Sequence, residues 1–286
     1  MGRVLDTLFK NRAAHRRSIC TYLNCGDPDV ATTRKLIELC DQKGVDLIEL
    51  GVPFANSFTD GASVLNSHQR ALHNGIGFEE VIEMVQGLRQ TSSIPIVLLA
   101  DFSHTVKARG LKDIIRTAKE ADIDGLLLHG LPPLYLNDYL QLTKEYSIAP
   151  VLSLYPNSKP QAIAQTVTNA RSFIYLVSQY GRTGSAIDFR AAPLQDFYRS
   201  IRAQTNLPLL AGFGIKDRAD IETIFSTSEL DGVIIGSAIT KIIERALIHH
   251  EDIIEQAANY LDSIIPTKEI IHTKQQFLET ASEHTA

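Results

Sequence analysis

Long apolar runs, an excess of charge of one sign and abundant cysteine are all missing from this sequence. No run reaches the roughly 18 apolar residues that cross a bilayer, and the N-terminus lacks the apolar core of a secretion signal. Asp6 stands where an N-myristoylation signal needs Ser or Thr. We therefore expect no membrane association.

The charge balance argues against a nucleic-acid partner. The net charge is −5, from 28 basic and 33 acidic residues that are mixed along the sequence, so no strongly basic surface is expected. One short basic cluster, Arg12, His15, Arg16 and Arg17, is predicted to be a solvated helix end.

The cysteines favour a reducing compartment. Cys20, Cys25 and Cys40 are odd in number, have apolar neighbours and lack metal-ligand spacing. We expect reduced thiols in or near the core of a cytoplasmic protein, and no metal site built on them.

Short runs rich in Val, Ile and Leu alternate with amphipathic stretches along the whole chain. Strands are predicted at 18–23, 47–52, 94–100, 125–130, 149–155, 172–178, 208–214 and 232–238. Helices are predicted at 30–43, 78–88, 111–121, 134–145, 160–170, 193–204, 217–226 and 239–249, with an extra N-terminal helix before the first strand.

This alternation predicts an α/β fold. Apolar strands separated by helices form a parallel sheet that is covered on both faces. Eight such units fit a closed (β/α)8 TIM barrel, a single domain over residues 1–286, with 266–286 as a C-terminal helix or a flexible tail. A dinucleotide-binding open sheet is less favoured, because no Gly-x-Gly-x-x-Gly turn follows the first strand.

Two connections are predicted to be long loops, 53–77 after the second strand and 179–192 after the sixth. Long loops in compact domains usually carry function. In a barrel both would open at the C-terminal face of the strands, where active sites are built.

Two carboxyl side chains are predicted to lie at this face. Glu49 lies in an apolar strand, where burial disfavours its charged form, whereas Asp60 lies on the following loop and should stay ionised. A lone Glu in a strand is more often a paired structural group. Its position beside Asp60 at the barrel mouth favours an acid/base pair.

Glycines follow the last three predicted strands, at Gly181 to Gly184, Gly212 to Gly214 and Gly236-Ser237. Each glycine motif alone is weak evidence for a ligand site, because ordinary turns also need glycine. Together, at the usual phosphate-binding place of this barrel, they predict a site for a phosphorylated small molecule.

With these motifs in place, the chain resembles the α subunit of tryptophan synthase, the indole-3-glycerol-phosphate lyase family. The specific stretch runs from Glu49 through Gly51-Val52-Pro53-Phe54 to Asp60-Gly61. Gly26-Asp27-Pro28 and the glycine motifs extend the similarity over most of the chain.

The resemblance implies a role for each matching residue. Glu49 would protonate the indole ring carbon and serve in the retro-aldol cleavage, and Asp60 would stabilise positive charge at the indole nitrogen and take its proton. Tyr175 would line the pocket, and Thr183 would close over Asp60. The phosphate cradle would comprise Gly184, Gly214, Gly236 and Ser237.

The resemblance also implies the partners and the cofactor. The substrate would be indole-3-glycerol phosphate, and the partner a β subunit in an α2β2 tetramer. No cofactor is expected on this chain, because pyridoxal phosphate would be bound only by the β partner.

Several loop residues depart from the family pattern. Asn56 and Ser57 replace Asp and Pro in a loop that docks on the β subunit in relatives. Asp101, His104 and His129 replace other residues near the mouth, where they would form either solvated loop groups or a metal or proton-relay site.

The sequence is compatible with three functions: an ordinary α subunit, a divergent lyase that works alone or on a related phosphorylated substrate, and a non-catalytic regulatory subunit. The presence of both Glu49 and Asp60 favours an enzyme.

Overall fold

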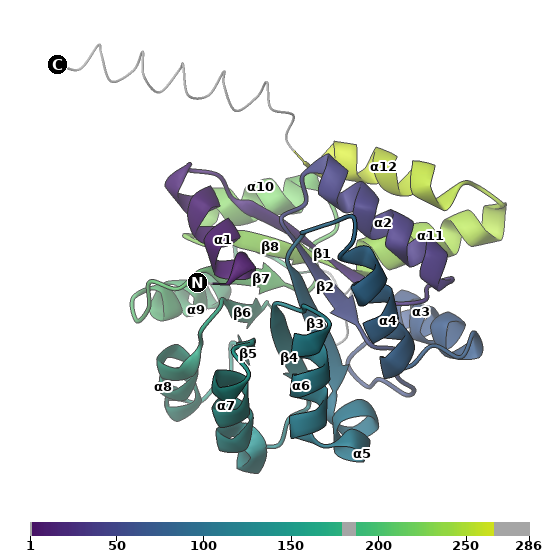
Figure 1. Ribbon diagram of the computed structural model, residues 1–286. Helices are drawn as coiled ribbons and strands as arrows, with labels where there is room; N and C mark the ends of the chain where they lie inside the picture. Colours follow the sequence, from purple (N-terminus) through teal and green to yellow (C-terminus); the bar gives the residue numbers. More distant parts are fainter. Residues whose placement is uncertain (1, 179–186, 266–286) are drawn as a thin grey trace.

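The computed structural model describes residues 2–178 and 187–265, which contain a closed barrel of eight parallel strands (Figure 1). Each strand pairs with the next, and β8 closes onto β1. The strands are β1 Ser18–Asn24, β2 Leu47–Gly51, β3 Ile96–Asp101, β4 Gly125–His129, β5 Ala149–Leu154, β6 Ile174–Val177, β7 Leu209–Gly212 and β8 Gly232–Ile235. The predicted (β/α)8 barrel is confirmed.

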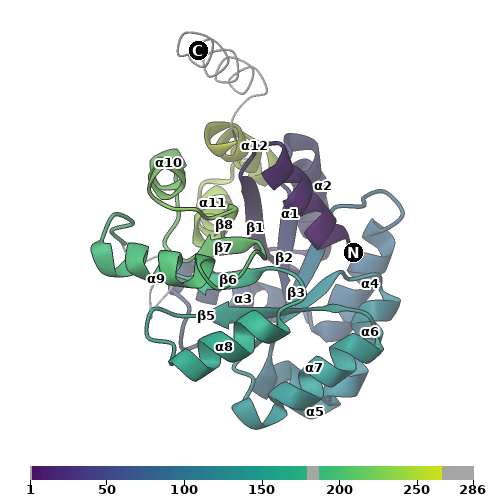
Figure 2. The same cartoon turned by 90° about the vertical axis from the view of Figure 1, so that its left-hand side faces the viewer.

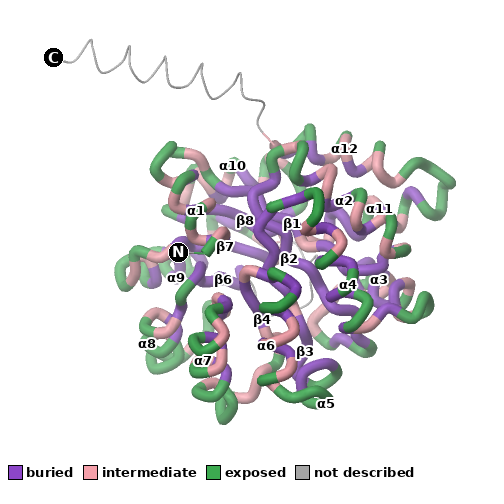
Figure 3. Tube along the Cα trace, viewed as in Figure 1, coloured by how far each residue is buried: buried purple, intermediate pink, exposed green. Residues whose placement is uncertain are grey.

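Helices surround the barrel in Figures 1 and 2. They are α1 Arg3–Ala13, α2 Val30–Lys43, α3 Ala62–His73, α4 Phe78–Leu88, α6 Leu111–Glu120, α7 Leu136–Glu145, α8 Pro160–Asn169, α9 Ala192–Arg202, α10 Arg218–Thr227, α11 Ser237–His249 and α12 Ile253–Ile264, with short turns η1 Phe102–Val106, α5 Lys107–Arg109 and η2 Pro133–Tyr135. Figure 3 shows the strands buried and the outer helix faces exposed. The predicted N-terminal helix is α1; α12 was not predicted.

The prediction that 53–77 is one long loop is wrong, because α3 occupies Ala62–His73. The buried positions of this helix include Ser63, Ser67 and His68. Polar residues on its buried face weaken the apolar period by which a helix is recognised in a sequence. The interpretation of 266–286 as a helix or tail concerns residues outside the described ranges.

The barrel interior is filled by every second residue of each strand, because successive strand side chains point to opposite faces. Near the N-terminal ends of the strands, an apolar cluster includes Cys20, Leu47 and Phe173, and Val4 and Leu8 of α1 belong to the same cluster. Helix α1 therefore closes this end of the barrel.

Three aspartates fix the N-terminal ends of neighbouring strands. Asp46, Asp124 and Asp231 directly precede β2, β4 and β8. Each carboxylate accepts a hydrogen bond from one backbone N–H near the start of the preceding strand in the barrel. The donors are Ile19, Ile96 and Leu209, at 2.9, 2.9 and 2.8 Å.

Arginines neutralise these buried carboxylates. The Arg12 guanidinium donates to both oxygens of Asp231 at 2.6 and 2.7 Å, and Arg16 donates to Asp46. Arg3 of α1 donates to Asp124 at 2.6 Å. The prediction that the basic cluster is a solvated helix end is therefore wrong for Arg12 and Arg16, whose partners lie far away in the sequence.

The cysteines are free and buried, as predicted for core thiols. Over the described ranges, no helix has both the length and the apolar character needed to cross a membrane.

Removing the Asp231 charge should destabilise the protein strongly. Asp231→Asn leaves Arg12 and Arg202 without their carboxylate, and losing one partner of a buried ion pair costs about 3 kcal/mol or more. The control is Asp262→Asn, which breaks the solvated pair with Lys43 and should cost less than about 1 kcal/mol. Urea unfolding measures both, and equal losses would contradict the structural role of Asp231.

Candidate active site

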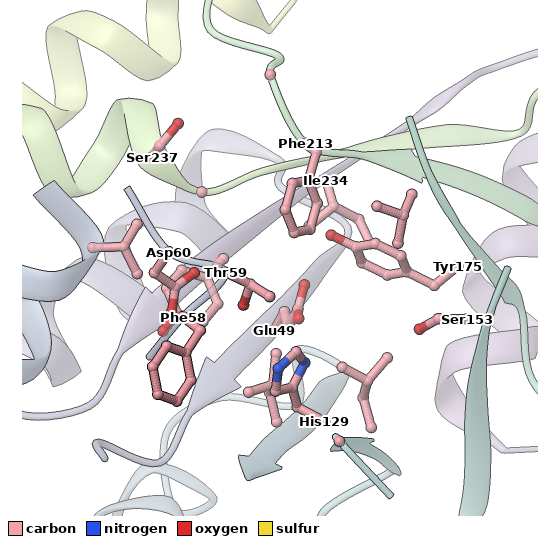
Figure 4. A pocket seen from close by; sticks show the side chains of 18 of the residues that line it. Glu49, Phe58, Thr59, Asp60, His129, Ser153, Tyr175, Phe213, Ile234 and Ser237 are labelled. Atoms are coloured by element: carbon pink, nitrogen blue, oxygen red, sulfur yellow. The ribbon is translucent and has the colours of Figure 1, made fainter. Parts of the chain in front are cut away.

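A cavity of about 490 Å3 opens at the C-terminal ends of the strands (Figure 4). Side chains from all eight strands or from the segments that follow them line it. This is the end of the barrel where loops build active sites. Glu49, Asp60, Tyr175, Gly214, Gly236 and Ser237, all predicted site residues, belong to its lining.

Strand β2 carries Glu49 into the cavity. Leu47, two residues earlier, lies in the apolar interior cluster, so the period of two places Glu49 one layer nearer the mouth. Its neighbour in register on β1 is Tyr22. Glu49 is only 4% exposed. Burial raises the pKa of Glu49 to about 8, and the negative charge of Asp60 adds to the rise.

Asp60 lies between β2 and α3, and its side chain is only 16% exposed. Its Oδ2 atom lies 3.4 Å from Nε2 of His68. Burial alone would raise the pKa of Asp60, but the His68 imidazole and the Ser57 hydroxyl outweigh it, with a smaller contribution from His129. The pKa of Asp60 is therefore lowered.

The two carboxyl groups thus differ in protonation near neutral pH. Glu49 is the protonated member of the pair, and Asp60 is the ionised one. Environments that separate two carboxyl pKa values are the usual basis for an acid and a charged partner in one site.

Tyr175 of β6 is 7% exposed and points into the cavity beside Glu49 (Figure 4). Its hydroxyl packs over Gly212 of β7, where a Cβ atom would lie 2.1 Å from it. Any larger residue at position 212 would displace the tyrosine. Burial raises the pKa of Tyr175, and the charge of Glu49 raises it further, so the phenol stays neutral.

The glycine-rich segments after β7 and β8 form another wall of the cavity. Figure 4 shows Phe213 and Ser237 on the side away from His129. Gly214 has φ of +77°, a conformation that favours glycine, and Phe213 shares the same φ despite its bulk. Gly236 and Ser237 open α11, whose first N–H groups have no partner within the helix. Such a terminus attracts anions.

Two predicted site residues, Thr183 and Gly184, lie outside the described residues, as does the rest of the Gly181–Gly184 motif.

The sequence did not identify several residues that line the cavity. They are Tyr22, His68, Leu99, Leu127, Ser153, Tyr155 and Phe213. Those on strands could have been found by counting two residues along each strand, in register with Glu49. His68 could not, because it lies on the unpredicted helix α3.

The histidines near the mouth separate into two environments. His104 is partly exposed, and its Nδ1 lies 2.7 Å from Asp101 Oδ1, whereas His129 lines the cavity. In the described part of the chain, no three His, Cys, Asp or Glu residues are arranged to hold a metal ion.

Comparison with known proteins gives one family. The family model described as tryptophan synthase alpha chain matches residues 8–267. The tryptophan synthase alpha chain of Nitrosomonas europaea is 33% identical over 86% of this chain and 88% of its own length. That of Chloroflexus aurantiacus is 33% identical over 93% and 98%.

Solved structures agree. Tryptophan synthase subunit alpha from Legionella pneumophila superposes with a TM-score of 0.84 at 26% identity, over 92% of this chain and 97% of its own. A chain from the tryptophan synthase complex of Pyrococcus furiosus gives 0.75 at 26% identity, over 86% and 97%.

The raised pKa of Glu49 predicts how stability depends on pH. Between the unfolded pKa near 4.5 and the folded value of about 8, the folded protein holds a proton that the unfolded chain has lost. Stability therefore falls with rising pH, by up to about 1.4 kcal/mol per unit. Glu49→Gln should remove this fall and so gain stability relative to wild type between pH 5 and pH 8.

Urea unfolding across this range measures the effect. Glu83→Gln, a change at an exposed position of α4, is the control and should run parallel to wild type. A parallel curve for Glu49→Gln would contradict the raised pKa.

Proposed function

Because this chain belongs to the tryptophan synthase alpha chain family, we propose that it cleaves indole-3-glycerol phosphate to indole and glyceraldehyde 3-phosphate. The observation that carries the proposal is the pair of carboxyl groups in one cavity, with the pKa of Glu49 raised and that of Asp60 lowered. A non-catalytic subunit would have no use for this separation.

Cleavage requires two proton movements. The ring carbon C3 must gain a proton, and the hydroxyl group on the adjoining side-chain carbon must lose one as the carbon–carbon bond breaks. Glu49 donates its proton to C3, and its carboxylate then accepts the hydroxyl proton. The bond electrons return to the ring, the hydroxyl carbon becomes the aldehyde, and Glu49 ends the cycle protonated.

Asp60 acts on the ring nitrogen. Protonation of C3 places positive charge on that nitrogen, and an ionised carboxylate stabilises this charge and takes up its proton until the bond breaks. The lowered pKa of Asp60 keeps the carboxylate available at neutral pH.

The cavity supplies complementary surfaces for the two ends of the substrate. Leu99, Leu127 and Ile234 offer an apolar surface for the indole ring, with Tyr175 beside Glu49. The phosphate would lie on the backbone around Gly214 and on the N-terminal turn of α11 at Gly236 and Ser237. Thr183 and Gly184 would complete the site, as the resemblance implies.

We further propose a β subunit as partner, in an α2β2 tetramer, with pyridoxal phosphate bound only there. The cleavage described above uses proton transfers to and from carboxyl groups of this chain, so we expect no cofactor on it. Two large apolar side chains are exposed beyond strand ends at this face, Phe58 at 90% and Leu134 at 73%, which supports a docking surface there. Asn56 has φ of +58°, which Asn tolerates, and lacks the charge of the family's Asp, so coupling to an ordinary β subunit should be weak.

Glu49→Gln keeps the size of the side chain but removes the transferable proton. Indole release should therefore fall by the 10²–10⁴-fold typical of general acid–base catalysis. The assay measures indole from purified protein and indole-3-glycerol phosphate, with and without a β subunit, and Glu83→Gln serves as the control. Near-normal release by Glu49→Gln would falsify the assignment.

Asp60→Asn should lower kcat more than it raises KM, because the charge that Asp60 stabilises exists mainly in the transition state. Steady-state kinetics separates the two constants. If KM rises while kcat holds, Asp60 only binds substrate.

A further inference from the structure

His68 is a buried histidine that the proposed mechanism does not use. It lies on α3, is 2% exposed and contributes to the cavity lining. Its ring packs against Phe54, with 4.6 Å between ring centroids. Burying an imidazole without hydrogen bonds is costly, so a buried histidine usually has partners at its ring nitrogens.

Phe54 and Asn24 hold the Nδ1 side of the His68 ring. The N–H of Phe54 donates to Nδ1 at 3.3 Å, and the Asn24 side-chain amide lies 3.1 Å from the same atom. On the other side of the ring, the Asp60 carboxylate can only accept a hydrogen bond, so its contact with Nε2 requires the proton on Nε2.

That proton faces Asp60. Nε2 is fully buried and has no hydrogen-bond partner among the described residues, yet it lies 3.4 Å from Asp60 Oδ2. Catalytic hydrogen bonds are often long in the absence of substrate. A shift of about 0.5 Å would bring the two atoms to an ordinary hydrogen-bond distance.

We propose that His68 is the positioning residue of Asp60: its Nε2–H orients the carboxylate toward the ring nitrogen of the substrate and stabilises its negative charge. Phe54 and Asn24 fix the imidazole from behind, so that α3 and the segment after β2 hold the carboxylate between them. The inference rests on the proposed function for its catalytic consequence, but not for the contact itself.

Other titratable groups also face Asp60, from several elements. They are Tyr22 on β1, Glu49 on β2, His129 at the end of β4 and Tyr175 on β6. His104 packs on Phe54 and pairs with Asp101 instead. Among the neighbours that lower the pKa of Asp60, His68 has the largest effect. Its loss should therefore raise that pKa, and the acid limb of the kcat–pH profile should move to higher pH.

Three substitutions separate positioning from packing. His68→Leu removes both nitrogens. His68→Asn keeps an amide near the Nδ1 position but has no donor toward Asp60, and His68→Gln extends a donor toward the Nε2 position. His73→Gln, at an exposed position of the same helix, is the control.

Two measurements are made on each variant. The first follows the Asp60 carboxyl carbon by NMR across pH, which needs no turnover. The second is the pH profile of kcat and KM for indole release. The His68→Leu and His68→Asn variants should raise the Asp60 titration midpoint, because a hydrogen bond to a charged group is lost. They should also lower kcat by roughly 10- to 100-fold, with a smaller change in KM. The His68→Gln variant should recover much of the wild-type midpoint and much of the wild-type kcat.

Asp60 titration in the Leu and Asn variants that matches His73→Gln would overturn the proposal, as would equal defects in Asn and Gln. If His68→Leu does not fold, the comparison of His68→Asn with His68→Gln still tests the proposal. If wild-type protein releases no indole, the proposed function fails, while the NMR titration still tests the contact between His68 and Asp60.

Discussion

Closure of eight strands into a barrel leaves a narrow interior that only every second side chain can enter. Register then decides what each layer contains. Leu47 joins the apolar layer that α1 closes, and Glu49, two residues on, enters the next layer with Tyr22 beside it. The glutamate cannot turn toward solvent, since its strand is paired on both sides. Its raised pKa is thus a consequence of barrel geometry.

The two ends of the barrel treat buried charge in opposite ways. At the N-terminal end, Asp46, Asp124 and Asp231 each receive a backbone N–H and an arginine, so their charges are compensated. At the C-terminal end Glu49 has no cationic partner in the described structure, and the neighbours that lower the pKa of Asp60 are two histidines and a serine hydroxyl instead of an arginine. The first arrangement stabilises the fold, and the second leaves groups free to exchange protons with a ligand. This division follows the general separation of stability and activity in such barrels.

The barrel, most of its helices and the positions of Glu49, Asp60 and Tyr175 in one cavity could be predicted, because strand periodicity is a local signal. The failures have a common cause. Arg12 and Arg16 looked solvated because their carboxylates lie far away in the sequence, and α3 was missed because its buried face is polar. The ion pairs of the arginines and the polar contacts of α3 form only in the folded chain, so local sequence patterns do not reveal them. His68 lies on α3 and was missed for the same reason.

The contact between Tyr175 and Gly212 has a counterpart across the barrel, where a Cβ atom at Gly51 would lie 2.6 Å from the Tyr22 hydroxyl. At each place a large ring occupies the volume that a missing side chain leaves. A single replacement of either glycine meets a clash, whereas loss of a ring alone opens a void. At these two places the cavity can therefore change shape without strain or a void only by paired substitutions on adjacent strands, and a mutational route through either pair passes through an intermediate with a strained or underpacked interior.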